Sequence, residues 1–328
     1  MSRRLTRLLL ILVFLVALPH RAPAPLVYRP GEGWTYEPYG GTTTWRRTRA
    51  KEQLELAQEA FDHKDYSLAL KAARRVLSQW PVSDYAPRAE YLVGRCHEIA
   101  GDAEAAFTEY QRLLEKQPKI ANFEEILRRQ YDIAGLFLAG KWFYLYGVIP
   151  IFSNMDKTAE LYAKIVKSGP YSEVAPMAQL QIGAAREKQK DYVLAAEAYQ
   201  VAADRYHDRP KFGAEALFKQ AVAYHKQAQK AEYDQTMAGQ AIATFNDFVT
   251  LYPNDERVAQ AQKTMLALRA EQARGYFVIA KFYERYQKWT GAATYYSEAL
   301  LLDPNATYAT EARQRIEAIK KLHPRPSL

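Results

Sequence analysis

Small and apolar residues recur along residues 50–322 with the spacing of amphipathic helices. In six successive segments an alanine follows a polar turn, and a second small or apolar residue follows that alanine by seven positions. Residues seven apart share one face of an α-helix, so each segment predicts a helix with one buried face. In five of the six segments a proline comes four or five residues later and is expected to end the helix. The six alanines are Ala69, Ala106, Ala159, Ala195, Ala241 and Ala292.

Another helical stretch precedes most of these helices and carries a small residue where two helices can approach closely. These small residues are Ala57, Gly94, Gly183, Ala221 and Ala280. Large side chains such as Tyr110 and Tyr199 are expected to fill the space toward the next pair. One pair cannot bury its apolar face alone, whereas stacked pairs share a continuous core. The pattern resembles the tetratricopeptide repeat and predicts an all-α superhelix, an α-solenoid of about six extended helix-turn-helix units. Residues 255–288 contain no proline, so one long helix or two nearly continuous helices should link the last two units.

The N-terminal residues 1–24 combine three arginines in residues 1–7 with an apolar run at residues 8–18. This pattern predicts an export signal, because the run is short for a bilayer span of about 20 residues. Pro25 follows the small residues of a possible cleavage site, so an uncleaved N-terminal anchor remains an alternative. Residues 25–49 are rich in Pro, Gly and aromatic residues and predict an extended linker, either a tether lying partly on the first helices or a partner-binding strand. Residues 323–328 form a tail.

Composition and charge exclude several classes of function. The net charge of +8 is concentrated in the N-terminal residues, so the nearly neutral array does not suggest nucleic-acid binding. The single cysteine, Cys96, excludes an internal disulfide or a multi-cysteine zinc site, and a buried, inert thiol is expected there. His97-Glu98 lacks the second histidine of a zinc-protease helix, and the sequence contains no phosphate-binding loop or G-x-S-x-G motif. The sequence therefore predicts neither an enzyme nor a cofactor.

Four stretches are similar to the BamD (YfiO-type) family, the tetratricopeptide outer-membrane assembly factors of Gram-negative bacteria. They are residues 169–172, 231–235, 241–253 and 273–286. The resemblance spans roughly residues 50–320. The chain departs from the family in lacking a lipidation cysteine near its N-terminal segment and in carrying an insertion after Phe137, at residues 140–155.

This resemblance implies a non-enzymatic periplasmic scaffold of the outer-membrane β-barrel assembly machinery. Such a scaffold binds a BamA-like assembly subunit and unfolded outer-membrane proteins. It is associated with the outer membrane through its partners or its N-terminal segment. The alternative is a periplasmic tetratricopeptide adaptor for another cell-envelope, division or polysaccharide-export complex.

Two surfaces are candidates for partner binding. Residues of one helix face in the first two units would line a mixed aromatic and basic groove for an extended peptide, or else form an ordinary solvated face. They are Lys51, Leu54, Gln58, Phe61, Arg88, Tyr91, Arg95 and Glu98. The insertion carries five aromatic residues that would contact a membrane or a partner if exposed, or would cap the neighbouring core if folded back. They are Trp142, Phe143, Tyr144, Tyr146 and Phe152.

Overall fold

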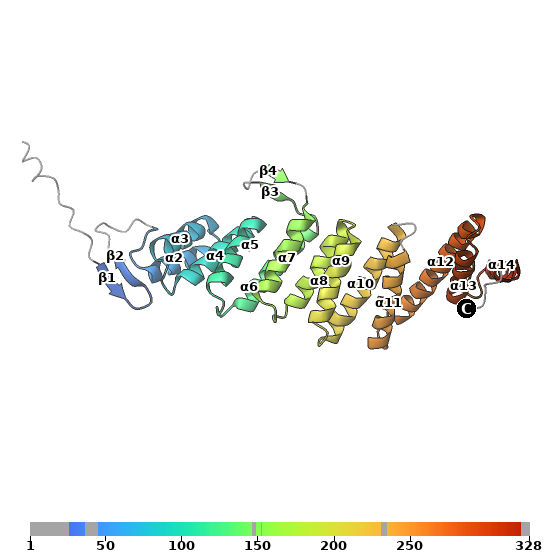
Figure 1. Ribbon diagram of the computed structural model, residues 1–328. Coiled ribbons are helices and arrows are strands. Elements are labelled where there is room, and N and C mark those ends of the chain that lie inside the picture. The colour runs from blue at the N-terminus through green and yellow to red at the C-terminus, as the bar shows by residue number, and fades with distance from the viewer. Residues whose placement is uncertain (1–25, 37–44, 146–148, 152, 231–234, 323–328) are drawn as a thin grey trace, which may run out of the picture. The chain divides into compact units, whose positions relative to one another are not determined.

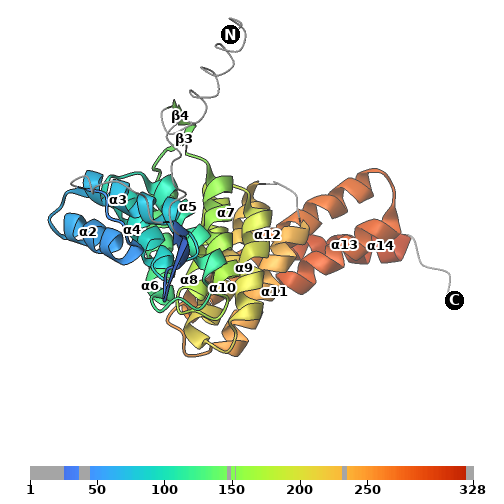
Figure 2. The same cartoon turned by 90° about the vertical axis from the view of Figure 1, so that its left-hand side faces the viewer.

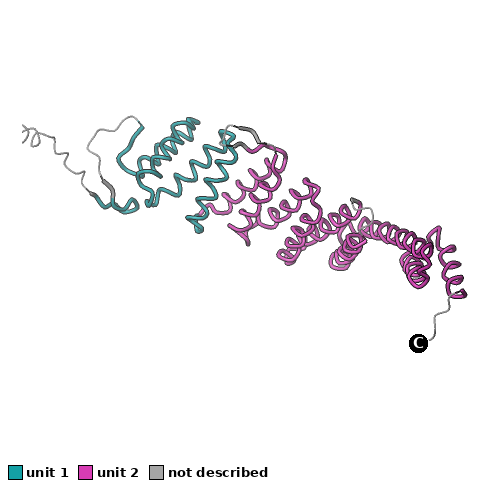
Figure 3. Tube along the Cα trace, turned by 45° about the horizontal axis from the view of Figure 1, so that its top comes forward, with its two compact units in different colours: residues 1–120 teal, residues 121–328 magenta. Residues whose placement is uncertain are grey.

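The computed structural model describes residues 26–36, 45–145, 149–151, 153–230 and 235–322 of the chain (Figure 1). The described part contains thirteen α-helices and two short β-hairpins, which confirms the prediction of an all-α tetratricopeptide array. Helices that follow one another in sequence pack together in pairs. The chain divides into two compact units, residues 1–120 and 121–328 (Figure 3). The predicted signal at residues 1–24 and the tail at residues 323–328 lie outside the described residues.

The first unit contains a hairpin and two helix pairs. The hairpin strands are β1 (Leu26–Arg29) and β2 (Gly33–Tyr36), and the helices are α2 (Ala50–Asp62), α3 (Tyr66–Gln79), α4 (Ala86–Ile99) and α5 (Ala103–Lys116). α2 packs on α3, α3 on α4 and α4 on α5. Leu54, Ala57, Ala72, Val76 and Leu92 belong to the core that joins α2, α3 and α4.

The N-terminal hairpin corrects the expectation of an extended linker over residues 25–49. Residues 26–36 fold back on themselves because Gly31 and Gly33 adopt positive φ angles of 78° and 74°, which favour glycine. The Gly31 carbonyl accepts a hydrogen bond of 2.8 Å from the Asp84 backbone amide, and the Glu32 side chain is buried. These contacts hold the hairpin against the start of α4. The composition of residues 25–49 is typical of a linker, so the sequence did not reveal the turn at Gly31 and Gly33.

The second unit contains the remaining helix pairs and the second hairpin (Figures 1 and 2). Its elements are α6 (Phe123–Leu138), β3 (Phe143–Leu145), β4 (Ile149–Ile151), α7 (Met155–Ser168), α8 (Ala175–Lys188), α9 (Tyr192–Arg205), α10 (Pro210–Lys230), α11 (Gln235–Leu251), α12 (Val258–Arg285), α13 (Trp289–Leu302) and α14 (Ala309–Leu322). Among the described helices, none combines the length and the apolar character that a membrane span requires.

The polar turns found in the sequence are helix caps. The carboxylates of Asp65, Asp102 and Asp191 accept hydrogen bonds from backbone amides three residues later, at the starts of α3, α5 and α9. An aspartate at this position satisfies an amide that has no partner within the helix. Asn154 caps α7 in the same way, through the backbone amide of Lys157. The repeated turn therefore has a local cause that sequence alone can show.

The small residues of the first helices face tyrosine rings rather than other small residues. A Cβ added at Gly94 would lie 2.5 Å from the Tyr110 ring, and one added at Gly183 would lie 2.4 Å from the Tyr199 ring. Each tyrosine hydroxyl then donates to a glutamate one helical turn beyond the glycine. Tyr110 donates to Glu98 at 2.6 Å and Tyr199 to Glu187 at 2.9 Å. The close approach predicted at these small residues therefore brings a tyrosine ring, for which the glycine makes room, against the first helix.

The same arrangement recurs in the sixth helix-turn-helix repeat, where α12 packs on α13. Tyr296 is fully buried and its hydroxyl donates to Glu284 at 2.7 Å. Burial, with Glu284 as the next cause, raises the pKa of this tyrosine, so the hydroxyl stays a donor. Ala280 stands at the position that glycine occupies in the other two units. The tyrosine and glutamate thus tie the two helices of a pair together in three units.

One long helix, α12, joins the fifth and sixth helix-turn-helix repeats, which confirms the prediction for residues 255–288. α12 has 28 residues. Its first half packs Ala261 and Met265 into a core with Phe245 and Phe248 of α11. Its second half packs Phe277 and Ala280 against α13 and α14.

Cys96 lies in the core of the first unit. It is 2% exposed, and burial raises the pKa of its thiol to about 11. A neutral buried thiol is unreactive, as the sequence predicted.

Candidate partner-binding surfaces

Four of the eight residues predicted to line a groove come together in the first unit. The Arg95 guanidinium donates to the Tyr91 hydroxyl at 3.4 Å, and its Nε lies 3.6 Å from a Glu98 carboxylate oxygen. Its central carbon lies 5.6 Å from the centre of the Phe61 ring. Phe61, Tyr91, Arg95 and Glu98 therefore form one aromatic and charged cluster between α2 and α4. Glu98 also accepts the hydrogen bond from Tyr110, so part of this cluster supports the fold.

Leu54 does not belong to this surface, which corrects the prediction. It is 6% exposed and lies in the core with Ala57 and Leu92. Lys51 and Gln58 are exposed, and each contacts an acidic residue of its own helix. Arg88 is also exposed, on α4. The helical spacing placed Lys51, Leu54 and Gln58 on one side of α2. The part of that side at Leu54 is packed into the core, whereas the rest is exposed.

The insertion after α6 forms a hairpin whose described aromatic residues divide between core and surface. β3 pairs antiparallel with β4, with Phe143 opposite Ile151. The Phe143 ring is 2% exposed and stacks on Phe137 of α6, with ring centres 4.1 Å apart. Trp142 is 49% exposed. The side chain of Tyr144, and all of Tyr146 and Phe152, lie outside the described residues.

Replacing Phe143 with leucine is expected to lower the free energy of unfolding of the second unit by about 1–2 kcal/mol. Leucine keeps an apolar side chain but loses the ring stacking on Phe137 and the Lys157 ammonium, which lies 4.9 Å from the ring centre. Trp142→Leu is the matched control and should change the stability by less than about 0.5 kcal/mol. Denaturant unfolding of both variants measures the difference. Equal values for the two would contradict the assignment of Phe143 to the core.

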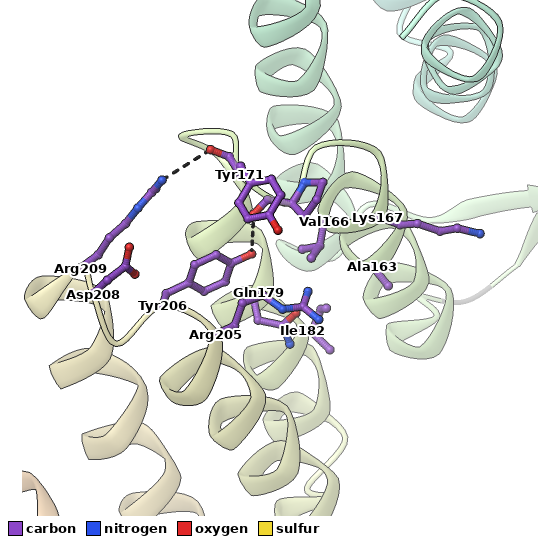
Figure 4. A pocket seen from close by; sticks show the side chains of 11 residues that line it. Ala163, Val166, Lys167, Tyr171, Gln179, Ile182, Arg205, Tyr206, Asp208 and Arg209 are labelled. Carbon is purple, nitrogen blue, oxygen red and sulfur yellow. Dashed lines mark hydrogen bonds between the residues drawn. The ribbon is translucent and has the colours of Figure 1, made fainter.

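A cleft of about 570 Å³ opens in the second unit, between the loop after α7 and the loop after α9 (Figure 4). Ser172 shapes the first loop, because its hydroxyl donates to the Gly169 carbonyl at 2.7 Å. The Tyr206 hydroxyl donates to the Pro170 carbonyl at 3.3 Å, and Arg209 reaches the Tyr171 carbonyl at 3.5 Å. The two loops are therefore tied to one another across the cleft.

The cleft combines apolar walls with cations. Val166 and Ile182 supply apolar surface, and the Tyr171 ring at the rim is 92% exposed. Arg205, which is exposed, lines the cleft together with Gln179, whereas the Lys167 side chain points away from them in Figure 4. Among the described residues no carboxylate forms an ion pair with Arg205 or Arg209, although Asp208 stands at the rim. Burial raises the pKa of the Tyr206 phenol, so it remains a neutral donor.

Sequence reasoning did not identify this cleft. Its first loop, residues 169–172, was recognised only as a mark of family resemblance. The signal that could have found it is the pair Arg205 and Arg209 at the end of a helix, opposite an exposed Tyr171. Within the described residues, no group of three His, Cys, Asp or Glu side chains could hold a metal ion.

Comparison with known proteins agrees with the helix pairs of both units. The model of the YfiO family, described as an outer membrane lipoprotein, matches residues 153–301, from the start of α7 to the end of α13. A tetratricopeptide repeat model matches residues 54–119, which cover α2 to α5. The β3–β4 hairpin lies outside both matches. A search of the curated proteins finds no match to this chain.

Several solved structures show a similar repeat arrangement. A tetratricopeptide repeat protein from Bacteroides fragilis is 15% identical, with a TM-score of 0.39, over 84% of this chain and 100% of that one. The C-terminal part of a repeat protein from Cytophaga hutchinsonii is 16% identical, with a TM-score of 0.36, over 80% and 87%. A repeat protein from Parabacteroides merdae is 13% identical, with a TM-score of 0.34, over 82% and 98%. Identities and TM-scores this low carry no information about partners.

The family match and the helix pairs lead to one assignment. The YfiO model covers α7 to α13, and the repeat model covers α2 to α5. A family of outer-membrane lipoproteins implies a location in the cell envelope, and tetratricopeptide arrays serve as protein-interaction scaffolds. The chain is therefore similar to the tetratricopeptide repeat over residues 54–119 and carries a BamD-like, YfiO-type segment at residues 153–301.

Proposed function

We propose that this protein is a non-enzymatic periplasmic scaffold of the outer-membrane β-barrel assembly machinery. It holds a BamA-like assembly subunit and unfolded outer-membrane proteins on separate surfaces. The observation that carries the proposal is the YfiO match over seven consecutive helices, α7 to α13. The protein associates with the outer membrane through its partners or through its N-terminal segment.

The surfaces of the first unit and of the hairpin are proposed to serve different partners. The cluster of Phe61, Tyr91 and Arg95, with Arg88 nearby on α4, offers aromatic and cationic groups to an extended client segment. The exposed Trp142 ring offers an apolar contact to a membrane surface or to the assembly subunit. The β3–β4 hairpin stands outside the family match, so its contact would be particular to chains with this insertion.

Mild cross-linking of the tagged protein in its native host tests the proposal. A barrel-bearing assembly subunit of the Omp85 type should be among the main captured proteins. Capture of division or polysaccharide-export proteins, with no barrel subunit, would contradict the assembly role and leave an envelope adaptor.

The client surface has its own test. Arg88→Glu reverses an exposed charge and should weaken binding of a labelled C-terminal barrel peptide by several-fold. Lys263→Glu, on the exposed surface of α12, should not. Equal binding by the wild type and Arg88→Glu would move the client site elsewhere.

A further inference from the structure

The first unit contains a second cleft built in the same way as the cleft of the second unit. It measures about 420 Å³ and lies between the loop after α3 and the end of α5. Ser83 shapes its loop by donating to the Trp80 carbonyl at 2.8 Å, as Ser172 does to Gly169. The equivalent positions keep a constant spacing along the sequence. They are Pro81 and Pro170, Ser83 and Ser172, Glu90 and Gln179, and Lys116 and Arg205.

The first cleft supplies its own carboxylate. Glu90 is 4% exposed, and its two carboxylate oxygens lie 3.1 Å and 3.4 Å from the Lys116 ammonium. Arg112 Nε lies 3.9 Å from the same carboxylate. The cation at the end of α5 is thus neutralised from within the unit. Few polar side chains are buried so fully, and this one is buried because it is paired.

The second cleft lacks this carboxylate. Gln179, which stands where Glu90 does, is 6% exposed and uses its amide Nε2 to donate to the Ala198 carbonyl at 3.3 Å. Arg205 replaces Lys116, and Arg209 adds a second guanidinium whose described partner is the Tyr171 carbonyl. Asp208 also lines this cleft, but among the described residues it forms no ion pair with either arginine. The cleft therefore keeps a cation in the place where its counterpart holds an ion pair.

We propose that the cleft of the second unit binds a carboxylate side chain from an acidic segment of a partner protein. The incoming carboxylate takes the place that Glu90 fills in the first unit and pairs with Arg205. The guanidinium suits this role, because it presents several donors in a plane that matches a carboxylate. Val166, Ile182 and the exposed Tyr171 ring contact the apolar residues that flank the acidic side chain. The proposal does not depend on the barrel-assembly role, since it describes a property of the second unit in any complex.

Binding of a fluorescein-labelled peptide of alternating glutamate and leucine to the full chain tests the proposal. Fluorescence anisotropy at low ionic strength measures the affinity. The same peptide with glutamine in place of glutamate should bind about tenfold more weakly, or weaker still. Arg205→Gln should weaken binding of the glutamate peptide by about tenfold. Gln179→Glu should weaken it to a similar degree, because it supplies a carboxylate from within. Lys211→Gln removes an equal charge from the exposed surface near the cleft and should leave the affinity within about twofold.

A competition measurement separates specific pairing from general screening. Acetate should displace the peptide more effectively than chloride at equal ionic strength, because the guanidinium pairs with carboxylate oxygens. The proposal is overturned if Arg205→Gln and Gln179→Glu leave the affinity unchanged while circular dichroism shows both variants folded. It is also overturned if acetate displaces the peptide no better than chloride, since the cleft would then act through nonspecific charge alone.

Discussion

Replacing Tyr199 with alanine is expected to lower the free energy of unfolding of the second unit by about 3–5 kcal/mol. The ring is fully buried, lies on Gly183 of α8 and belongs to a core that includes Ala216 and Ala223 of α10. Its removal leaves a cavity that the backbone of α8 cannot fill, because glycine has no side chain to move into it. Denaturant unfolding measures the loss. Hydrogen exchange followed by mass spectrometry should show it as faster exchange in α8, α9 and α10.

Two controls separate the causes. Tyr199→Phe keeps the ring and removes only the hydrogen bond to Glu187, so it should cost about 1–3 kcal/mol. Gly183→Ala adds a Cβ atom that would clash with the buried Tyr199 ring, so it should also lower the free energy of unfolding of the second unit. Gly135→Ala in α6 meets nothing closer than 3.8 Å and should be neutral or stabilising by up to about 1 kcal/mol. A stabilising Gly183→Ala would show that the ring is free to move.

Replacing Arg257 with alanine is expected to lower the free energy of unfolding by about 2–3 kcal/mol at pH 7. Its guanidinium makes two hydrogen bonds of 2.8 Å to the Asp255 carboxylate and a third to Glu215. It also lies 4.8 Å from the centre of the Phe218 ring. Only 22% of the side chain is exposed, so solvent screens these interactions less than it screens a surface ion pair. Denaturant unfolding at pH 7 measures the difference.

The pH dependence of this effect follows from Asp255. The hydrogen bond from Arg257 is the main cause that lowers the pKa of the Asp255 carboxyl in the folded chain. A group with a lowered folded-state pKa stabilises the fold above its unfolded pKa, about 3.9, and that contribution is lost as the pH falls through the folded pKa. The difference between wild type and Arg257→Ala should therefore shrink below about pH 4. Arg274→Ala removes an exposed pair with Glu271 on α12 and should cost less than about 1 kcal/mol. Equal losses of stability for Arg257→Ala and Arg274→Ala would contradict the expectation that the more buried arginine contributes more.

The parts of the fold that depend on neighbours in sequence could be predicted from the sequence. Asp65 and Asp191 cap helices through amides three residues away, and the length of α12 follows from the absence of a proline. The hairpins were not predicted, because proline, glycine and aromatic residues obscure the alternation that marks a strand. The cleft was not predicted either, since the loops that hold Pro170 and Tyr206 are separated in sequence and meet only in the fold.

Sequence reasoning about the groove was right for some residues and wrong for others. It placed Phe61 and Arg95 on one surface, and they do lie together. It also placed Leu54 there, although Leu54 is buried. The face of a helix that meets solvent is decided by how its neighbours pack, and regular spacing along one helix does not contain that information.

The length of α12 has a consequence for how the C-terminal end of the chain opens. A repeat array ordinarily frays from its ends one repeat at a time, because each repeat contacts only its neighbours. α12 supplies the second half of one core, with α11, and the first half of the next, with α13. No loop separates these halves, so the second half of α12 can unfold separately from the first only if backbone hydrogen bonds break within the helix. Once α13 and α14 have separated from α12, further unfolding toward the N-terminus meets no loop before the start of α12, so both halves of that helix should open as one cooperative block.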